Sequence, residues 1–98
     1  MSPGYQAVQS CHAMRQFTEE HPEIDKQWFK SSNYIVLLSV ENEEALENLI
    51  AIASIKNVRL AIFREPDIGN QITAIAFEPG EQSRRLCSRL KLALNETK

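Results

Sequence analysis

Apolar residues recur at three- and four-residue intervals near the start of the chain, which is the spacing of one face of a helix. They are Ala7, Val8, Cys11, Met14 and Phe17. Ser2 can cap the first turn, and Pro3 suits the first helical position because its missing N–H costs nothing there. Pro22 disfavours the helical conformation in the residue before it. We therefore predict a first helix that ends before Pro22.

A second short helix is predicted over residues 23–29, with three apolar side chains facing inward: Ile24, Trp28 and Phe29. The next segment, residues 34–40 (YIVLLSV), is β-branched and almost continuously apolar. That pattern is typical of a strand covered on both faces. Asn42 can cap a following helix whose first turn holds Glu43 and Glu44, where the helix dipole favours acidic groups.

Two further strands are predicted over residues 58–64 (VRLAIFR) and 71–77 (QITAIAF), separated by the turn-forming residues EPDIGN. The short connection indicates that these two strands run antiparallel. A strand, a helix and a strand over residues 34–64 form one βαβ unit with a parallel pair. A last helix is predicted over residues 82–94, with Leu86, Cys87, Leu90 and Leu94 on one face.

This order predicts an α/β fold with three layers, α/β/α, and a mixed sheet of about three strands with helices on both faces. The 98 residues suffice for one domain, residues 1–98. The longest apolar run is five residues, so we expect no membrane span, no leader and a cytoplasmic location. Two cysteines, Cys11 and Cys87, occupy apolar helix positions, and we expect them to pack in the core as free thiols.

The charge is unevenly distributed along the chain. Residues 1–50 carry 3 basic and 8 acidic groups, whereas residues 51–98 carry 8 basic and 5 acidic groups. The net charge of -2 argues against a globally basic nucleic-acid binder, but it does not exclude a local basic patch. Four cations lie on the predicted last helix: Arg84, Arg85, Arg89 and Lys91. They could face the phosphates of a nucleic acid, or they could form an ordinary solvated helix face.

Two groups of polar residues are candidates for chemistry. Tyr5, Gln9 and His12 share one face of the first helix, bordered by Gln6, although such a histidine could also be a half-buried core residue. Asp67 lies in the EPDIGN turn at a sheet end, where it could orient a water or serve only the turn. Thr73 follows on the next strand. The chain contains no metal-ligand spacing, so no metal or other cofactor is expected.

Four segments together resemble the type-II peptidyl-tRNA hydrolase family: SPGYQAVQSCHA at residue 2, the stretch over residues 34–67, TAIAFEPGE at residue 73 and RLKLAL at residue 89. The resemblance implies an α/β fold and metal-free hydrolysis of the ester between a peptide and tRNA. It implies that Gln9, His12 and Thr73 are catalytic, together with Asp67, for which Glu65 is the rival position. Substrate contacts would come from Tyr5, Gln6, Arg84 and Arg85.

The chain departs from the family at three places. Tyr5 stands where the family has a lysine, the loop after the acidic residue is shortened to EPDIGN, and the family's first strand is not found before Ser2. We therefore expect the strand over residues 34–40 to pair beside that over residues 71–77, and a homodimer to form through the exposed sheet edge. An active hydrolase binding tRNA weakly or transiently is one hypothesis. The other is an inactive relative that binds protein or RNA or acts in assembly.

Overall fold

The computed structural model describes residues 2–93, and it is an α/β structure. It begins with helix α1 (Pro3–Glu20), as expected, and the Tyr5 N–H donates to Ser2 Oγ over 3.2 Å. Helix α2 (Pro22–Lys30) follows directly after His21. Phe29, expected to face inward on this helix, is 66% exposed, whereas Ile24 and Trp28 are half-buried.

The face that α1 buries agrees with the predicted one only in part. Its buried residues are Gln9, Ala13 and Phe17, whereas Val8 is 51% exposed and Cys11 also faces solvent. The expectation that Cys11 packs in the core is therefore wrong. The physical reason is that amide side chains on the other face of α1 make hydrogen bonds to the strands. Gln16 Nε2, for example, donates to the Ile62 carbonyl oxygen over 2.9 Å. These bonds leave Val8, Cys11 and Met14 of the predicted apolar stripe facing solvent, whereas Phe17 of the same stripe is buried.

Helix α3 (Glu43–Ile55) begins as predicted, because the Ala45 N–H donates to Asn42 Oδ1 over 2.9 Å. Strands β2 (Leu60–Glu65) and β3 (Gln71–Phe77) form an antiparallel pair, which confirms the prediction for these two strands. A single 3₁₀ turn, η1 (Pro66–Ile68), and two residues with positive φ, Gly69 at 71° and Asn70 at 63°, connect them.

The expected three-stranded mixed sheet is not formed within residues 2–93. Strand β1 is only Leu38–Ser39, and it pairs antiparallel with β4 (Lys91–Leu92) instead of lying beside β3. The Ala93 N–H extends this pairing to the Leu37 carbonyl oxygen over 2.8 Å. The parallel βαβ pair and the three-layer arrangement around one sheet are therefore not confirmed, because the described strands form two separate antiparallel pairs.

The last predicted helix is also shorter than expected. Helix α4 (Glu81–Leu86) ends in a turn, and the chain then becomes β4 instead of continuing as a helix. Arg89 and Lys91 thus follow α4 and do not share a helix face with Arg84 and Arg85. Cys87, expected in the core, is half-buried, and burial raises the pKa of its thiol. The predicted position of Leu94 lies outside the described residues.

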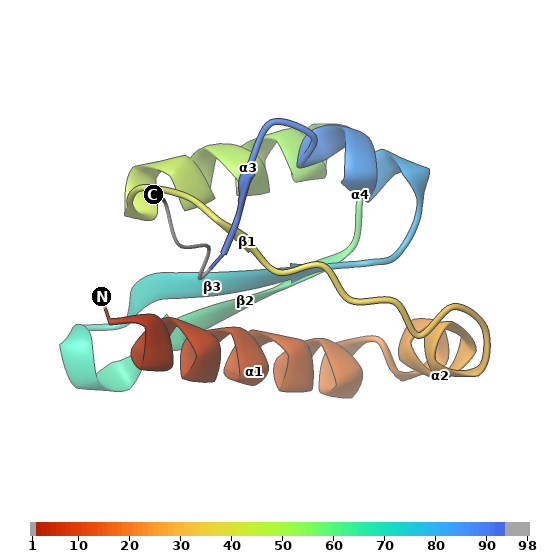
Figure 1. The fold of residues 1–98 in the computed structure, drawn as a ribbon, viewed down its shortest axis with the longest axis horizontal. Helices are drawn as coiled ribbons and strands as arrows, with labels where there is room; N and C mark the ends of the chain where they lie inside the picture. The colour runs from red at the N-terminus through yellow and green to blue at the C-terminus, as the bar shows by residue number, and fades with distance from the viewer. Residues whose placement is uncertain (1, 94–98) are drawn as a thin grey trace.

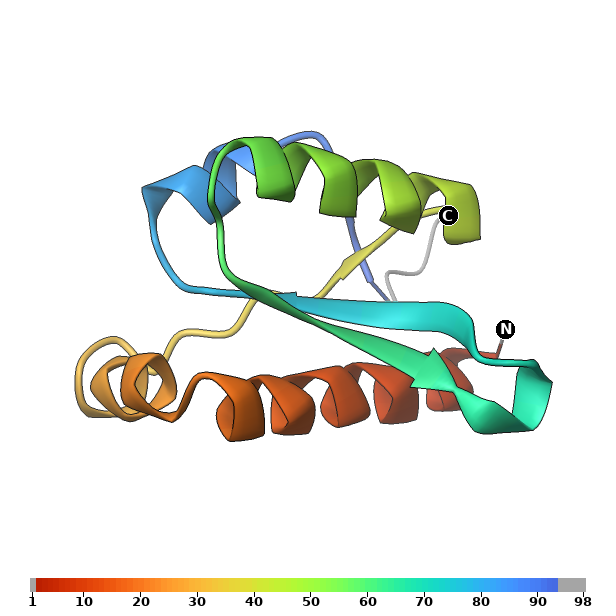
Figure 2. The same cartoon turned by 180° about the vertical axis from the view of Figure 1, so that it is seen from behind.

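Helices lie on two sides of the β2–β3 pair. Helix α1 runs along one side, and α3 and α4 lie on the other (Figure 1). Helix α1 contacts both β2 and β3, whereas α3 contacts β3. The turn between β2 and β3 lies beside the N-terminal end of α1, as the view from behind also shows (Figure 2). No helix within residues 2–93 is long and apolar enough to span a membrane.

Candidate active site

Gln9 joins three separate elements through its side-chain amide. It lies on the second turn of α1 and is only 2% exposed. Gln9 Nε2 donates to Glu65 Oε1 over 2.9 Å, and Gln9 Oε1 accepts from the Thr73 hydroxyl over 2.5 Å. Both ends of the buried amide are thus satisfied, which fixes the orientation of its donor toward the carboxylate. Gln9 and Thr73, two of the predicted site residues, are brought together here.

Glu65 is the carboxylate of this cluster. It ends β2, caps η1 and is 9% exposed. Its Oε2 accepts from the Asp67 N–H over 3.3 Å. The hydrogen bond from Gln9 is the largest cause that lowers the pKa of Glu65, followed by the Asp67 N–H, and together they outweigh the opposing effect of desolvation. Glu65 is therefore ionised at neutral pH.

A bulge in β3 explains how Thr73 reaches Gln9. Phe63 lies opposite Ala74, but the next residue of β2, Arg64, lies opposite Ile72. Thr73 is therefore the extra residue on β3, and a bulge of this kind redirects a side chain out of the regular alternation. The bulge makes the Thr73 hydroxyl available to a helix that packs on the hairpin.

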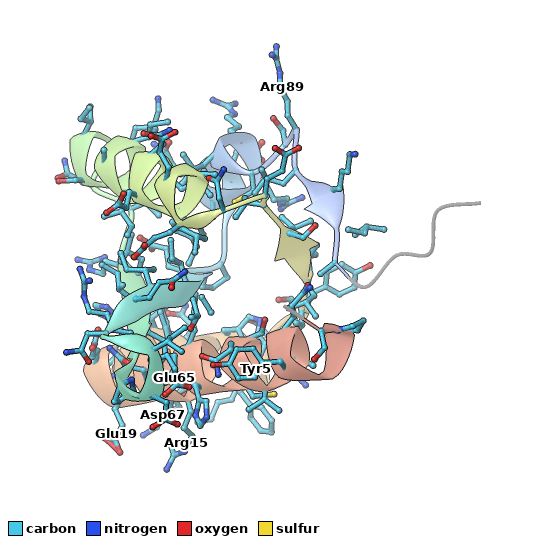
Figure 3. The ribbon with its side chains drawn as sticks, turned by 90° about the vertical axis from the view of Figure 1, so that its left-hand side faces the viewer. Tyr5, Arg15, Glu19, Glu65, Asp67 and Arg89 are labelled. Atoms are coloured by element: carbon cyan, nitrogen blue, oxygen red, sulfur yellow. The ribbon has the colours of Figure 1, made fainter. Side chains whose placement is uncertain are left out.

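Tyr5 closes the cluster at the start of α1, and its side chain is 36% exposed. Its hydroxyl hydrogen-bonds to Glu65. Desolvation raises the pKa of Tyr5, and the charges of Glu65 and Asp67 raise it further. The phenol is thus a neutral donor where the resemblance implied a cation. Figure 3 shows Tyr5 on α1 next to Glu65 and Asp67 at the end of the hairpin.

His12 lies one turn after Gln9 and is exposed, so it is not a half-buried core histidine. Its ring stacks on Phe63, with centroids 4.7 Å apart and planes 19° from parallel. The charge of His12 contributes to the lowered pKa of Glu65, which indicates that the ring lies close to the cluster. His12 thus places an imidazole ring at the edge of the site.

The remaining predicted residues lie at the rim of the cluster or away from it. The Asp67 side chain is exposed, and only its backbone N–H bonds to Glu65. Gln6 is half-buried on α1, where its carbonyl accepts from Ser10 Oγ over 3.0 Å. Arg84 and Arg85 lie on α4, on the other side of the strands, and Arg85 pairs with Glu81 over 3.5 Å. The structure does not bring these arginines to the Gln9 cluster.

Sequence reasoning gave Glu65 only as the rival of Asp67, although a signal for it exists. Glu65 lies four positions after Ala61 on β2, so the two side chains are on the same face of the strand. Ala61 is fully buried, which indicates that Glu65 also lies on the covered face. Asp67 instead belongs to the turn. Within residues 2–93, no group of three His, Cys, Asp or Glu side chains could hold a metal ion. The cluster offers a carboxylate, two hydroxyls, an amide and an imidazole, which suit proton transfer and the orientation of a water.

Residues 1–93 of this 98-residue chain match the family described as peptidyl-tRNA hydrolase PTH2. No curated protein matches the chain. The matched region contains all the residues of the cluster, from Tyr5 on α1 to Thr73 on β3. Because the match covers nearly the whole sequence, the chain belongs to the peptidyl-tRNA hydrolase PTH2 family.

Proposed function

We propose that this protein hydrolyses the ester bond between a peptide and tRNA at the Tyr5–Gln9–Glu65–Thr73 cluster. The observation that carries the proposal is the buried Gln9 amide, held by the Thr73 hydroxyl and directed at the Glu65 carboxylate. The amide thus joins α1 to two residues of the hairpin that are more than 50 positions away in the sequence. Membership of the PTH2 family supports a peptidyl-tRNA hydrolase-like function.

Ester hydrolysis needs an oriented water, a group that takes its proton and a donor for the developing oxyanion. In our proposal Glu65 orients the water, because its lowered pKa keeps it ionised at neutral pH and an ionised carboxylate only accepts hydrogen bonds. His12 is exposed beside it and accepts the proton. Asp67 assists at the rim, and the neutral Tyr5 hydroxyl turns its single O–H from Glu65 to the developing oxyanion. Gln9 and Thr73 are enclosed, so they act as positioning residues for Glu65.

The test measures release of the peptide from N-blocked aminoacyl-tRNA by the wild type and by two matched variants. Glu65→Gln removes the charge at the centre of the cluster, whereas Asp67→Asn removes the neighbouring charge at the rim. We expect Glu65→Gln to lose most of the turnover and Asp67→Asn to lose less. A wild type that releases no peptide would refute hydrolysis and leave the protein- or RNA-binding alternative. Equal rates for the wild type and Glu65→Gln would remove Glu65 from the mechanism.

We further propose that tRNA binds weakly through cations that include Arg84 and Arg85. Both are exposed at the end of α4, a position open to a phosphate backbone. Binding through phosphates weakens as salt rises. Titrating tRNA at two salt concentrations therefore tests this contact, and the paired change Arg84→Gln, Arg85→Gln should weaken binding and flatten its salt dependence. Binding that is equally tight at both concentrations would contradict the proposal.

We also propose a cytoplasmic location, where tRNA substrates are found, and a homodimer through an exposed sheet edge. Unpaired strand edges tend to associate with other strands unless they are covered. Sedimentation of the full chain over a range of concentrations tests the homodimer.

A further inference from the structure

Helix α1 lies lengthwise along β2 and contacts it in regular steps (Figures 1 and 2). The groups that meet along this interface are Gln9 with Glu65, His12 with Phe63, Gln16 with Ile62, and His21, just after α1, with Leu60. Residue numbers rise along α1 as they fall along β2, so the two elements run in opposite directions. The steps match in length, because a helix rises about 18 Å over residues 9–21 and a strand spans about 17 Å over residues 60–65.

The contact made by His12 differs from those on either side of it. Its neighbours along α1 are hydrogen bonds, made by the amides of Gln9 and Gln16 over 2.9 Å each. His12 instead stacks on Phe63, with ring centroids 4.7 Å apart and planes 19° from parallel. Within residues 2–93, no protein group hydrogen-bonds to either ring nitrogen of His12. Both nitrogens are therefore free to exchange a proton, and the stack is the contact that limits the orientation of the ring.

The stack also places His12 beside the carboxylate of the cluster. Phe63 and Glu65 are two positions apart on β2, so their side chains lie on the same face of the strand. Gln9 and His12 are three positions apart on α1, so they are neighbours on one face of the helix. The ring that covers Phe63 therefore lies next to the carboxylate that Gln9 holds. After the hydrogen bonds from Gln9 and the Asp67 N–H, the charge of this ring is a further cause of the lowered pKa of Glu65.

We propose that Phe63 is a positioning residue for the hydrolysis proposed above, on which this inference rests, and that it holds the His12 imidazole where it takes the proton of the attacking water. The water on Glu65 gives one proton to a ring nitrogen as its oxygen bonds to the ester carbon. The imidazolium then returns that proton to the tRNA oxygen as the ester bond breaks. The base of a hydrolase is commonly oriented by a third group. Here an aromatic ring takes that part.

A stacked partner suits a ring that changes its charge during the reaction. Two neutral aromatic rings attract each other in an offset stack. A cation within about 6 Å of the ring centre is also attracted to the face of a phenylalanine. At 4.7 Å, His12 is thus held by Phe63 both before and after it takes the proton. A carboxylate in the place of Phe63 would instead favour the charged form of the imidazole.

The test compares the same change at two positions of one hairpin by the kinetics of peptide release. Phe63→Leu removes the aromatic face beneath His12, whereas Phe77→Leu removes a half-buried ring at the far end of β3, opposite Leu60. We expect Phe63→Leu to lower kcat about tenfold or more with KM unchanged, because a positioned base acts in the transition state. Phe63→Tyr keeps the aromatic face and should retain most of kcat, and Phe77→Leu should leave kcat unchanged.

The NMR resonances of the His12 ring protons give a readout that does not depend on hydrolysis. Protons above the face of a benzene ring are shifted upfield by its ring current, so wild-type His12 should show this shift. Phe63→Leu should remove the shift, whereas Phe77→Leu should keep it. A wild type without the shift lacks the stack and overturns the inference, even where Phe63→Leu does not fold.

The kinetic outcomes separate this inference from the proposed function. A wild type that releases no peptide overturns the proposed hydrolysis, and with it this role of Phe63. An active wild type whose Phe63→Leu variant keeps its kcat overturns only the role of Phe63, and so does an equal loss of kcat in Phe77→Leu. A rise in KM with kcat unchanged would mean that Phe63 contacts substrate and does not position His12, which also overturns the inference.

Discussion

Replacing Thr73 by valine tests whether the hydroxyl is needed to hold the buried amide. Valine has nearly the same shape and favours strands at least as well, so neither packing nor strand propensity should cost stability. The change does remove the donor to Gln9 Oε1, on a side chain that is 2% exposed. An unsatisfied buried acceptor costs about 1–3 kcal/mol. For a domain of this size, each kcal/mol lowers the melting temperature by roughly 4–8 °C.

Urea denaturation measures this loss, with Thr73→Ser as the control because serine keeps the hydroxyl. We expect Thr73→Val to unfold at a lower urea midpoint than Thr73→Ser, with the same slope, which indicates that stability and not compactness has changed. If Thr73→Val is as stable as Thr73→Ser, the hydroxyl does not hold Gln9, and the reasoning about the cluster is wrong.

Three further predictions concern single groups. The pKa of Glu65 is lowered in the folded state, so its contribution to stability is present at neutral pH and is lost as pH falls through that pKa. Acid unfolding followed by circular dichroism should therefore show that the stability of Glu65→Gln depends less on pH than that of the wild type. Asn42→Ala removes the side-chain acceptor for the Ala45 N–H and should destabilise the protein by about 1 kcal/mol in urea, whereas Asn42→Ser should retain most of that stability. Cys11 is exposed and burial raises the pKa of Cys87, so a thiol reagent near pH 8 should modify Cys11 first; faster modification of Cys87 would contradict its burial.

Local signals predict several elements well. The bounds of β3, the caps at Ser2 and Asn42 and the end of α1 before Pro22 all follow from residues within a few positions of one another. Short-range chemistry decides these features, and it is visible in the sequence. The antiparallel pairing of β2 and β3 also follows from the shortness of their connection.

Features that depend on distant partners could not be predicted in the same way. The apolar spacing of Val8, Cys11 and Met14 suggests a buried face, but the burial of α1 is decided by amides that bond to strands more than 40 residues away. The pairing of β1 with β4 depends on where the chain goes after α4, which no local pattern reveals. For the same reason the pattern could not choose Glu65 over Asp67, because the choice depends on what α1 places against each carboxylate.

The unequal lengths of the paired strands have a consequence for how this chain can vary. β2 has six residues and β3 has seven, and the extra one is Thr73. Deleting Thr73 would restore an even ladder, with Ala74 still opposite Phe63 and Ile72 still opposite Arg64. The strand pairing would be preserved, but no hydroxyl would then face Gln9. The cluster should therefore tolerate changes of length in the turn, between Glu65 and Gln71, much better than the loss of this one residue from β3.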